Sequence, residues 1–172
     1  MPHCIILCGM PASGKSTWRN EIILKGYEVL SSDDLIEEYA RSIGKTYDEV
    51  FTAYISVAED RFWSSLELAV TEKRNIIVDR TNINQKARRR ILARLTKDYT
   101  KTAVAFIPPD RQADYDEHMR RLKNRPGKTI PKHVLLSMQA NFQVPTEEEG
   151  FEIVQLFNIW GDDYYSDRKS VV

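Results

Sequence analysis

The chain has 172 residues, of which 42% are hydrophobic and 29% are charged, and its formal net charge at pH 7 is zero. A chain of this length can bury one core well but is too short for two domains that each have a core of their own, so we expect a single domain over residues 1–172. A neutral protein does not rely on bulk electrostatic attraction to nucleic acid, and no apolar stretch is long enough to cross a membrane.

The first predicted strand begins next to the N-terminus, which leaves no room for a secretory signal. We therefore expect a soluble, cytoplasmic protein that has no membrane partner. Cys4 and Cys8 share one short extended segment and lie too far apart to form a disulfide, so both should be reduced. His3, His118 and His133 lack the spacing of metal ligands, which predicts no structural zinc.

A segment from Gly9 to Ser16 has the spacing of a phosphate-binding loop, or P-loop: Gly-Met-Pro-Ala-Ser-Gly-Lys-Ser. Gly9 and Gly14 permit a tight loop whose backbone N–H groups point inward at phosphate oxygens. Lys15 supplies a mobile positive charge for the β- and γ-phosphates, and the Ser16 hydroxyl can ligate Mg²⁺ where the next helix starts. The loop predicts binding of ATP or another nucleoside triphosphate; a glycine-rich turn without a ligand is the alternative.

Apolar runs and helical patterns alternate along the whole chain. Strands are predicted at 3–8, 27–31, 75–79, 102–107 and 151–157. Helices are predicted at 17–25, 46–71, 85–95, 111–123 and 131–142, and one more ends at residue 43. The alternation predicts a parallel sheet between layers of helices, followed by a partly ordered tail at 160–172.

Two of these helical segments allow more than one interpretation. The segment 46–71 has an apolar stripe that we interpret as packing surface, within which Trp63 is a candidate for lining a cleft. Basic residues gather at 88–97, where a solvated helix face explains them about as well as phosphate binding does.

Two aspartates follow apolar runs that are predicted to be strands. Asp33 and Asp79 should therefore lie at the carboxyl ends of the sheet and meet the P-loop in one crevice. Phosphoryl transfer needs a carboxylate that orients or deprotonates the attacking hydroxyl, and aspartates that organise Mg²⁺ occupy similar positions. Either aspartate could therefore take either of these two roles. Either aspartate could instead be a helix N-cap, for which Asp34 is better placed than Asp33.

A second basic segment at 120–132 contains no acidic residue and is interrupted by proline and glycine. We interpret it as a lid, because guanidinium groups carried by a loop can clamp donor phosphates. Arg121 and Arg125 lie four residues apart and share a face if the helix continues. Lys123 and Lys128 fit a solvated basic helix end, which the helix macrodipole favours.

Four segments, 9–18, 32–34, 78–84 and 121–131, together resemble the kinase domain of the 5′-polynucleotide kinases of phages, bacteria and animals. A fifth, at 141–151, looks like the C-terminal part of the same domain. The resemblance implies an α/β, P-loop kinase-like three-layer sandwich with a mainly parallel central sheet. It places 46–71 near the acceptor cleft and a helical, basic lid at 120–132.

The resemblance also implies an activity: transfer of the ATP γ-phosphate to the 5′-hydroxyl of a DNA or RNA end, with Mg²⁺, as in nucleic acid repair. Asp33 is then the general base, Asp79 supports the site, and Lys15 and Arg125 hold the donor. The implied donor contacts are Gly9, Ala12, Ser13, Gly14, Lys15, Ser16, Thr17, Arg121 and Arg125, with Ser16 as the metal ligand. The implied acceptor contacts are Asp33, Asp79, Thr81, Asn82 and Arg41.

The chain departs from the phage pattern at one position. In the phage enzymes, an arginine three residues after the base contacts the acceptor phosphate. This chain has Ile36 at that position, so Arg41 or Arg80 would have to replace the arginine. No aspartate-rich phosphatase signature is present, which predicts a kinase alone. A small-molecule or nucleoside kinase and a non-catalytic, ATP-dependent binding module are the alternatives. The preference for DNA or RNA and assembly into a homo-oligomer stay open.

Overall fold

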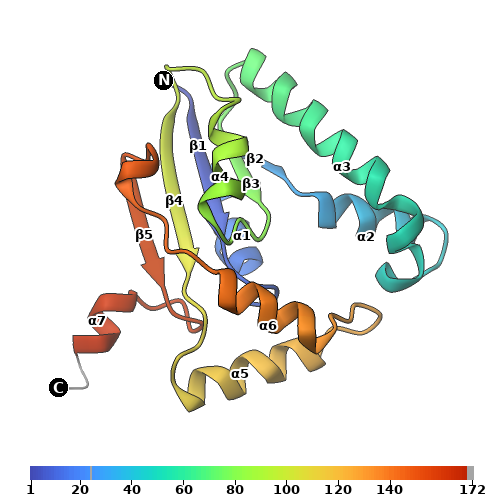
Figure 1. Cartoon of the computed structure of the whole chain (residues 1–172). Coiled ribbons are helices and arrows are strands. Elements are labelled where there is room, and N and C mark those ends of the chain that lie inside the picture. The colour runs from blue at the N-terminus through green and yellow to red at the C-terminus, as the bar shows by residue number, and fades with distance from the viewer. Residues whose placement is uncertain (24, 170–172) are drawn as a thin grey trace.

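A computed structural model describes residues 1–23 and 25–169 of the protein. Its central sheet has five parallel strands in the order β2-β3-β1-β4-β5 (Figure 1). The strands are β1 (His3–Cys8), β2 (Glu28–Leu30), β3 (Ile76–Asp79), β4 (Thr100–Phe106) and β5 (Ile153–Phe157). This arrangement confirms the predicted α/β fold with a parallel sheet.

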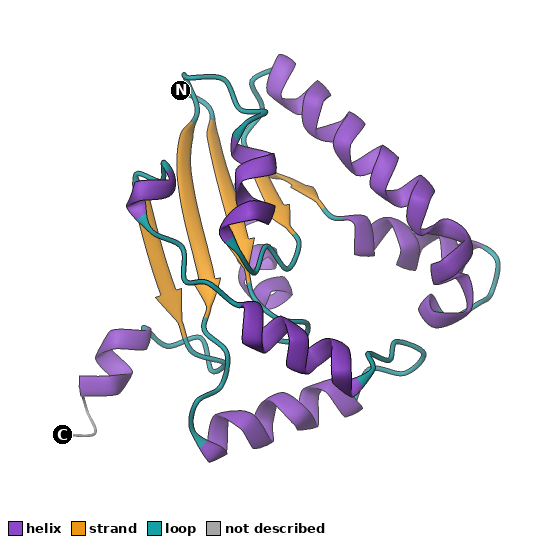
Figure 2. Ribbon diagram, in the orientation of Figure 1, coloured by secondary structure: helices purple, strands orange, loops and turns teal. Residues whose placement is uncertain are grey.

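Helices cover both faces of the sheet (Figure 2). One face is covered by α1 (Lys15–Ile23), and the other by α3 (Tyr47–Thr71) and α4 (Gln85–Leu92). Helix α2 (Ser32–Ser42) packs against α3. Beyond the carboxyl ends of the strands lie α5 (Gln112–Lys123) and α6 (Lys132–Asn141), and the chain continues through a 3₁₀ turn (Glu147–Glu149) to β5 and α7 (Tyr164–Lys169).

The alternation of side chains along β1 supplies both layers of the core. Cys4, Ile6 and Cys8 face α3 and α4, whereas Ile5 and Leu7 face α1. Every one of these side chains is buried, which is why β1 is a continuous apolar run rather than an alternating one. Both thiols are free, and burial raises the pKa of Cys4 and of Cys8 to about 12, so neither is a reactive thiolate at neutral pH.

The N-cap alternatives for the two aspartates are wrong. Helix α2 begins at Ser32, and its N-cap is Ser31, whose hydroxyl accepts a hydrogen bond from the Asp34 N–H at 3.2 Å. Serine caps a helix as well as aspartate does, and Ser31 has the extended backbone that a cap requires. Asp33 thus lies in the first turn of α2, and Asn84 rather than Asp79 caps α4.

Other differences concern the ends of elements. Helix α1 begins at Lys15, two residues before the predicted start, because the P-loop leads directly into it. Residues 164–169 of the expected tail form α7, and 170–172 lie outside the described residues. Within the described ranges, no helix is long and apolar enough to span a membrane, and no group of three or more His, Cys, Asp or Glu could hold a metal ion.

Candidate active site

A cavity of about 1280 Å³ opens at the carboxyl ends of the strands. Its walls come from the P-loop, the starts of α2 and α3, the end of β3, the loop between α5 and α6, and the turn after β5. The structure therefore brings the P-loop, Asp33 and Asp79 together, as their positions after strands predict. The predicted site residues that line this cavity are Ala12, Ser13, Gly14, Lys15, Ser16, Thr17, Asp33, Asp79, Thr81, Arg121 and Arg125.

The P-loop is held in a strained, closely packed conformation. Gly14 has φ +113°, and a Cβ there would lie 3.1 Å from the Phe106 ring, so the position requires glycine for both its backbone and its space. Ala12 also has a positive φ of 61°, which is unfavourable for a residue with a side chain. The loop is anchored to the sheet by the Gly9 N–H, which donates to the Thr81 carbonyl at 2.8 Å.

Lys15 is buried beneath the loop, and its Nζ donates to the carbonyls of Gly9 at 2.6 Å and Met10 at 3.1 Å. Burial lowers the pKa of Lys15 to about 8, and the carboxylates of Asp79 and Asp33 oppose this shift. The positive charge of the Lys15 ammonium group is thus only partly balanced by groups of the protein. An anion in the cavity, such as a nucleotide phosphate, would complete its environment.

Two further polar atoms fit an anionic ligand. Among the described residues, neither the Ser13 hydroxyl nor the Arg125 Nη1 has a hydrogen-bond partner, although both atoms are buried. Buried polar groups are nearly always paired, so unpaired ones in a cavity mark a place for a ligand. The Ser16 hydroxyl lies in the same cavity at the start of α1, where it fits a Mg²⁺ bound to phosphate oxygens.

The Asp33 carboxylate faces the cavity with 55% of its side chain exposed. The Tyr47 hydroxyl donates a hydrogen bond to Asp33 Oδ1 at 2.7 Å, and Lys128 Nζ lies 3.5 Å from Oδ2. Burial, followed by the negative charge of Asp33, raises the pKa of Tyr47, so the phenol stays protonated and remains a donor. Three elements therefore meet at this carboxylate: α2, α3 and the loop after α5.

The interpretation of Lys128 as part of a solvated helix end is wrong. Its side chain is only 15% exposed, because the loop after α5 folds across α2 and places Nζ 2.8 Å from the Glu37 carboxylate. The ammonium also lies 4.5 Å from the centre of the Tyr47 ring. Sequence separation hides both contacts, and no motif marks either residue.

The predicted lid is docked onto the start of α3. The Asp48 N–H donates to the Gly127 carbonyl at 2.9 Å, and the Asp48 carboxylate accepts hydrogen bonds from the Thr129 N–H and hydroxyl. Gly127 has φ +70°, and a Cβ there would lie 2.6 Å from Thr46 Cβ. The loop thus lies against α3 and lines the cavity, and its glycine permits the close approach to α3.

Asp79 differs from Asp33 in its surroundings. It is 8% exposed, and Arg19 Nη1 bridges it, at 2.9 Å, to Asp34, at 2.8 Å. Burial raises the pKa of Asp79, whereas Lys15 and Arg19 partly offset that rise. The two carboxylates thus differ in their surroundings: Asp33 is exposed to the cavity, whereas Asp79, which also lines it, is buried in an ion pair with Arg19. Arg19 was not apparent from any sequence pattern.

Two predicted acceptor contacts do not line the cavity. Asn82 is buried, has φ +43°, and donates from Nδ2 to the Leu7 carbonyl at 2.8 Å, so it ties the loop after β3 to β1. Arg41 is exposed in the last turn of α2. Arg80, in contrast, lines the cavity and donates from Nη2 to both carboxylate oxygens of Glu59, at 3.0 and 3.1 Å.

The turn after β5, where the expected partly ordered tail begins, also reaches the cavity. Trp160 and Gly161 line the wall there. The Trp160 indole N–H donates to buried Asp114 at 2.8 Å, and its backbone N–H donates to Asn158 Oδ1 at 2.9 Å. One turn further along the same buried face of α5, His118 Nε2 donates to the Pro11 carbonyl at 2.8 Å and holds the P-loop against that helix.

Two curated proteins are similar to the chain in sequence. The human heterogeneous nuclear ribonucleoprotein U-like protein 2 is 27% identical over 149 residues, which are 82% of this chain and 19% of that protein. The bifunctional polynucleotide phosphatase/kinase of Schizosaccharomyces pombe is 24% identical over 152 residues, which are 88% of this chain and 32% of that protein. The chain thus spans about a fifth to a third of the length of these relatives.

Several solved structures share the fold. A protein of the PezAT chromosomal toxin–antitoxin system of Streptococcus pneumoniae superposes with a TM-score of 0.67 at 15% identity, covering 96% of this chain and 70% of that one. A chain of the Pnkp1/Rnl/Hen1 RNA repair complex gives 0.62 at 21% identity, with coverages of 88% and 46%. A sugar kinase from Janibacter sp. HTCC2649 gives 0.56 at 14% identity, with coverages of 99% and 92%.

The P-loop, the parallel sheet and these neighbours together identify the P-loop kinase fold, which implies binding of ATP. The sequence profile of the AAA_33 family, described as an AAA domain, matches residues 4–145, which include the P-loop, both aspartates and the lid. The chain belongs to this AAA domain family.

Proposed function

We propose that this domain transfers the γ-phosphate of ATP to the 5′-hydroxyl at the end of a DNA or RNA strand. The observation that carries the proposal is the Asp33 carboxylate, which is exposed to the same cavity as the P-loop and receives a hydrogen bond from Tyr47. A nucleic-acid acceptor is further supported by the similarity to the polynucleotide phosphatase/kinase and by the fold shared with the RNA repair complex.

The size of the cavity also supports two substrates. Pockets for single small molecules usually occupy about 300–1,000 Å³, whereas this cavity has about 1280 Å³. We place ATP phosphates at the P-loop, with Lys15, Arg121 and Arg125 around them. The acceptor hydroxyl then approaches from the side of α2 and α3, where Asp33 lies.

The proposed reaction follows from these positions. Asp33 accepts the proton of the 5′-hydroxyl, whose oxygen forms a bond to the γ-phosphorus while the bond from phosphorus to the β–γ bridging oxygen breaks, releasing ADP. Lys15 and Arg125 stabilise the charge on the transferring group. Ser16 would hold Mg²⁺, which would supply charge neutralisation at the phosphates. Tyr47 and Lys128 hold the Asp33 carboxylate in place.

An acceptor panel tests the substrate class. Wild-type protein is incubated with γ-labelled ATP, Mg²⁺ and one acceptor at a time: a 5′-hydroxyl oligonucleotide, the same strand with a 5′-phosphate, or a nucleoside or sugar. We expect label only on the 5′-hydroxyl strand. Label on the nucleoside or the sugar alone would mean that the acceptor is a small molecule and not a nucleic-acid end.

That second candidate, a small-molecule kinase, is supported by the fold shared with the sugar kinase and by the lid contacts, which close the cavity beside Asp33. A non-catalytic ATP-dependent binding module is the third. It would bind ATP but transfer phosphate to no acceptor in the panel.

A further inference from the structure

We propose that the acceptor strand leaves the cavity across a surface formed by Arg80, Trp63, Arg90 and Arg94, which binds the nucleotides behind the 5′ end. We call these four residues the arginine–tryptophan surface. The proposal rests on the proposed function and adds to it a strand-binding site outside the cavity. It also makes the acceptor a chain of nucleotides rather than a single one.

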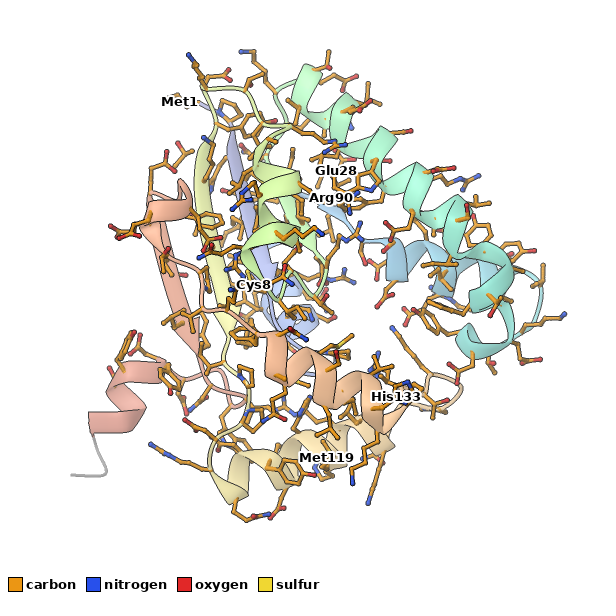
Figure 3. All side chains as sticks on the ribbon, viewed as in Figure 1. Met1, Cys8, Glu28, Arg90, Met119 and His133 are labelled. Carbon is orange, nitrogen blue, oxygen red and sulfur yellow. The ribbon has the colours of Figure 1, made fainter. Side chains whose placement is uncertain are left out.

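Three guanidinium groups surround one indole ring. The Cζ atoms of Arg94, Arg90 and Arg80 lie 4.2, 4.8 and 5.6 Å from the centre of the Trp63 ring. They come from three places in the chain: the turn after α4, α4 itself and the residue that follows β3, while Trp63 lies on α3. Figure 3 labels Arg90 on the side of α4 that faces α3.

The charges on this surface are not balanced within the protein. Arg80 is paired with Glu59, but no described carboxylate lies within ion-pair distance of Arg90 or Arg94, and both side chains are exposed. Arg80 Nη1 is buried and has no hydrogen-bond partner in the described part of the chain. Like charges held this close repel one another, and bound phosphates would remove that cost.

The geometry leaves the guanidinium edges available. A guanidinium that lies over an aromatic ring uses its face for the cation–π contact, so its N–H groups can still donate to phosphate oxygens. One N–H group of Arg94 is already used, because Nη1 donates a hydrogen bond to the Arg90 carbonyl at 2.8 Å. The outer faces of Arg90 and Arg94 can in turn stack against bases.

The surface is continuous with the cavity. Arg80 and Glu59 line the cavity wall, and the same Arg80 guanidinium lies against Trp63 and, at 4.5 Å, against the Phe62 ring. A strand whose 5′-hydroxyl reaches Asp33 can therefore pass Arg80 and meet Arg90 and Arg94 outside. Positive groups combined with an aromatic platform fit a single-stranded nucleic acid, whose phosphates and bases alternate.

The test compares acceptor lengths. KM and kcat are measured with 5′-hydroxyl strands of two and twelve nucleotides for the wild type and for Arg90→Ala/Arg94→Ala. We expect the double substitution to raise KM for the longer strand about tenfold and to flatten its salt dependence, while the values for the dinucleotide stay unchanged. The control is Lys86→Ala/Arg89→Ala, which removes two positive charges from exposed positions on α4 outside the arginine–tryptophan surface; it should leave the kinetics with both strands unaffected.

Equal effects of Arg90→Ala/Arg94→Ala on both lengths, or none on either, would overturn the proposal. So would a matching loss in the control, because the effect would then reflect the net charge of α4. If the wild type transfers phosphate to neither strand, the proposed function fails instead. Binding of a fluorescent twelve-nucleotide strand, measured by anisotropy in the same variants, then tests the strand-binding surface separately. The surface is supported if only Arg90→Ala/Arg94→Ala weakens binding. It is excluded if the wild type does not bind the strand, if the double substitution has no effect, or if a polyglutamate peptide competes equally well.

Discussion

The Tyr47 hydroxyl and the Asp33 carboxylate form a 2.7 Å hydrogen bond that joins the first turn of α3 to the first turn of α2. Lys128 lies on the lid at 3.5 Å from the other carboxylate oxygen and over the Tyr47 ring. The proposed base is therefore oriented by two separate elements. One of them, the loop after α5, also carries Arg125, which lines the same cavity, so a single loop supplies residues to both sides of the proposed site.

Removal of the Tyr47 hydroxyl should slow transfer without weakening ATP binding. In Tyr47→Phe the ring remains, but the carboxylate loses a fixed donor, so we expect kcat to fall about tenfold. Tyr54→Phe is the matched control, because Tyr54 stacks on Tyr39 through its ring. Steady-state kinetics with ATP and the acceptor varied separately measure the effect; an unchanged kcat would exclude an orienting role for Tyr47.

The contact between Gly127 and Thr46 should control closure of the lid. Gly127→Ala and Gly44→Ala both introduce a side chain at positive φ, 70° and 68°, and this backbone strain alone should cost each about 1 kcal/mol of unfolding free energy. Only at Gly127 does the new Cβ also meet Thr46. We therefore expect KM for ATP to rise in Gly127→Ala alone, with faster proteolysis of the loop 124–131. Equal kinetics in the two variants would contradict docking of the lid.

Binding of ATP above pH 8 should take up a proton. Burial holds the pKa of Lys15 near 8 in the free protein, and phosphate oxygens beside the ammonium would raise it. Below pH 8 the lysine is already protonated, so the uptake appears as the pH rises through 8, where the affinity also begins to fall. Calorimetry at pH 9 in buffers of different ionisation enthalpy measures it, and Lys15→Met should abolish it. A protonation-neutral reaction at pH 9 in the wild type would be inconsistent with this role.

Arg19 should stabilise the fold through Asp79. Arg19→Met leaves a buried carboxylate without its partner, which we expect to cost about 3 kcal/mol at pH 8. Burial raises the pKa of Asp79 in the folded state, and loss of Arg19 raises it further. Protonation of Asp79 therefore stabilises the folded protein below the pKa that the carboxyl has in the unfolded chain, and this stabilisation is lost as the pH rises through the folded-state pKa. The cost should therefore be smaller at pH 5. Chemical denaturation of Arg19→Met and of Arg19→Met/Asp79→Asn, which should recover stability, tests the pairing.

The fold was predictable from the sequence because its signals are local. The buried runs around Ile6 and Ile77 are continuous, and the P-loop is a contiguous motif between a strand and a helix. The meeting of Asp33 and Asp79 followed from topology, since parallel strands end at the same edge of a sheet. The cap position could not be predicted, because Ser31, Asp33 and Asp34 are all good caps and only the backbone decides among them.

The rest of the candidate site depends on contacts between distant segments. Tyr47 and Lys128 reach Asp33 only after α3 and the lid have folded over α2. Asn82 follows a strand as a site residue would, yet its amide is used by the Leu7 carbonyl. Trp160 belongs to the cavity because Asp114 fixes its indole. No local pattern distinguishes these outcomes.

The role of Asp33 as the base is tested by single-turnover transfer of γ-phosphate to a 5′-hydroxyl oligonucleotide by Asp33→Asn, with ATP binding measured in parallel. The control is Glu38→Gln, an exposed substitution on the same helix outside the cavity. We expect a loss of at least about 10²-fold in Asp33→Asn with unchanged ATP affinity, and wild-type transfer in Glu38→Gln. Transfer by Asp33→Asn at the wild-type rate would contradict the assignment of Asp33 as the base.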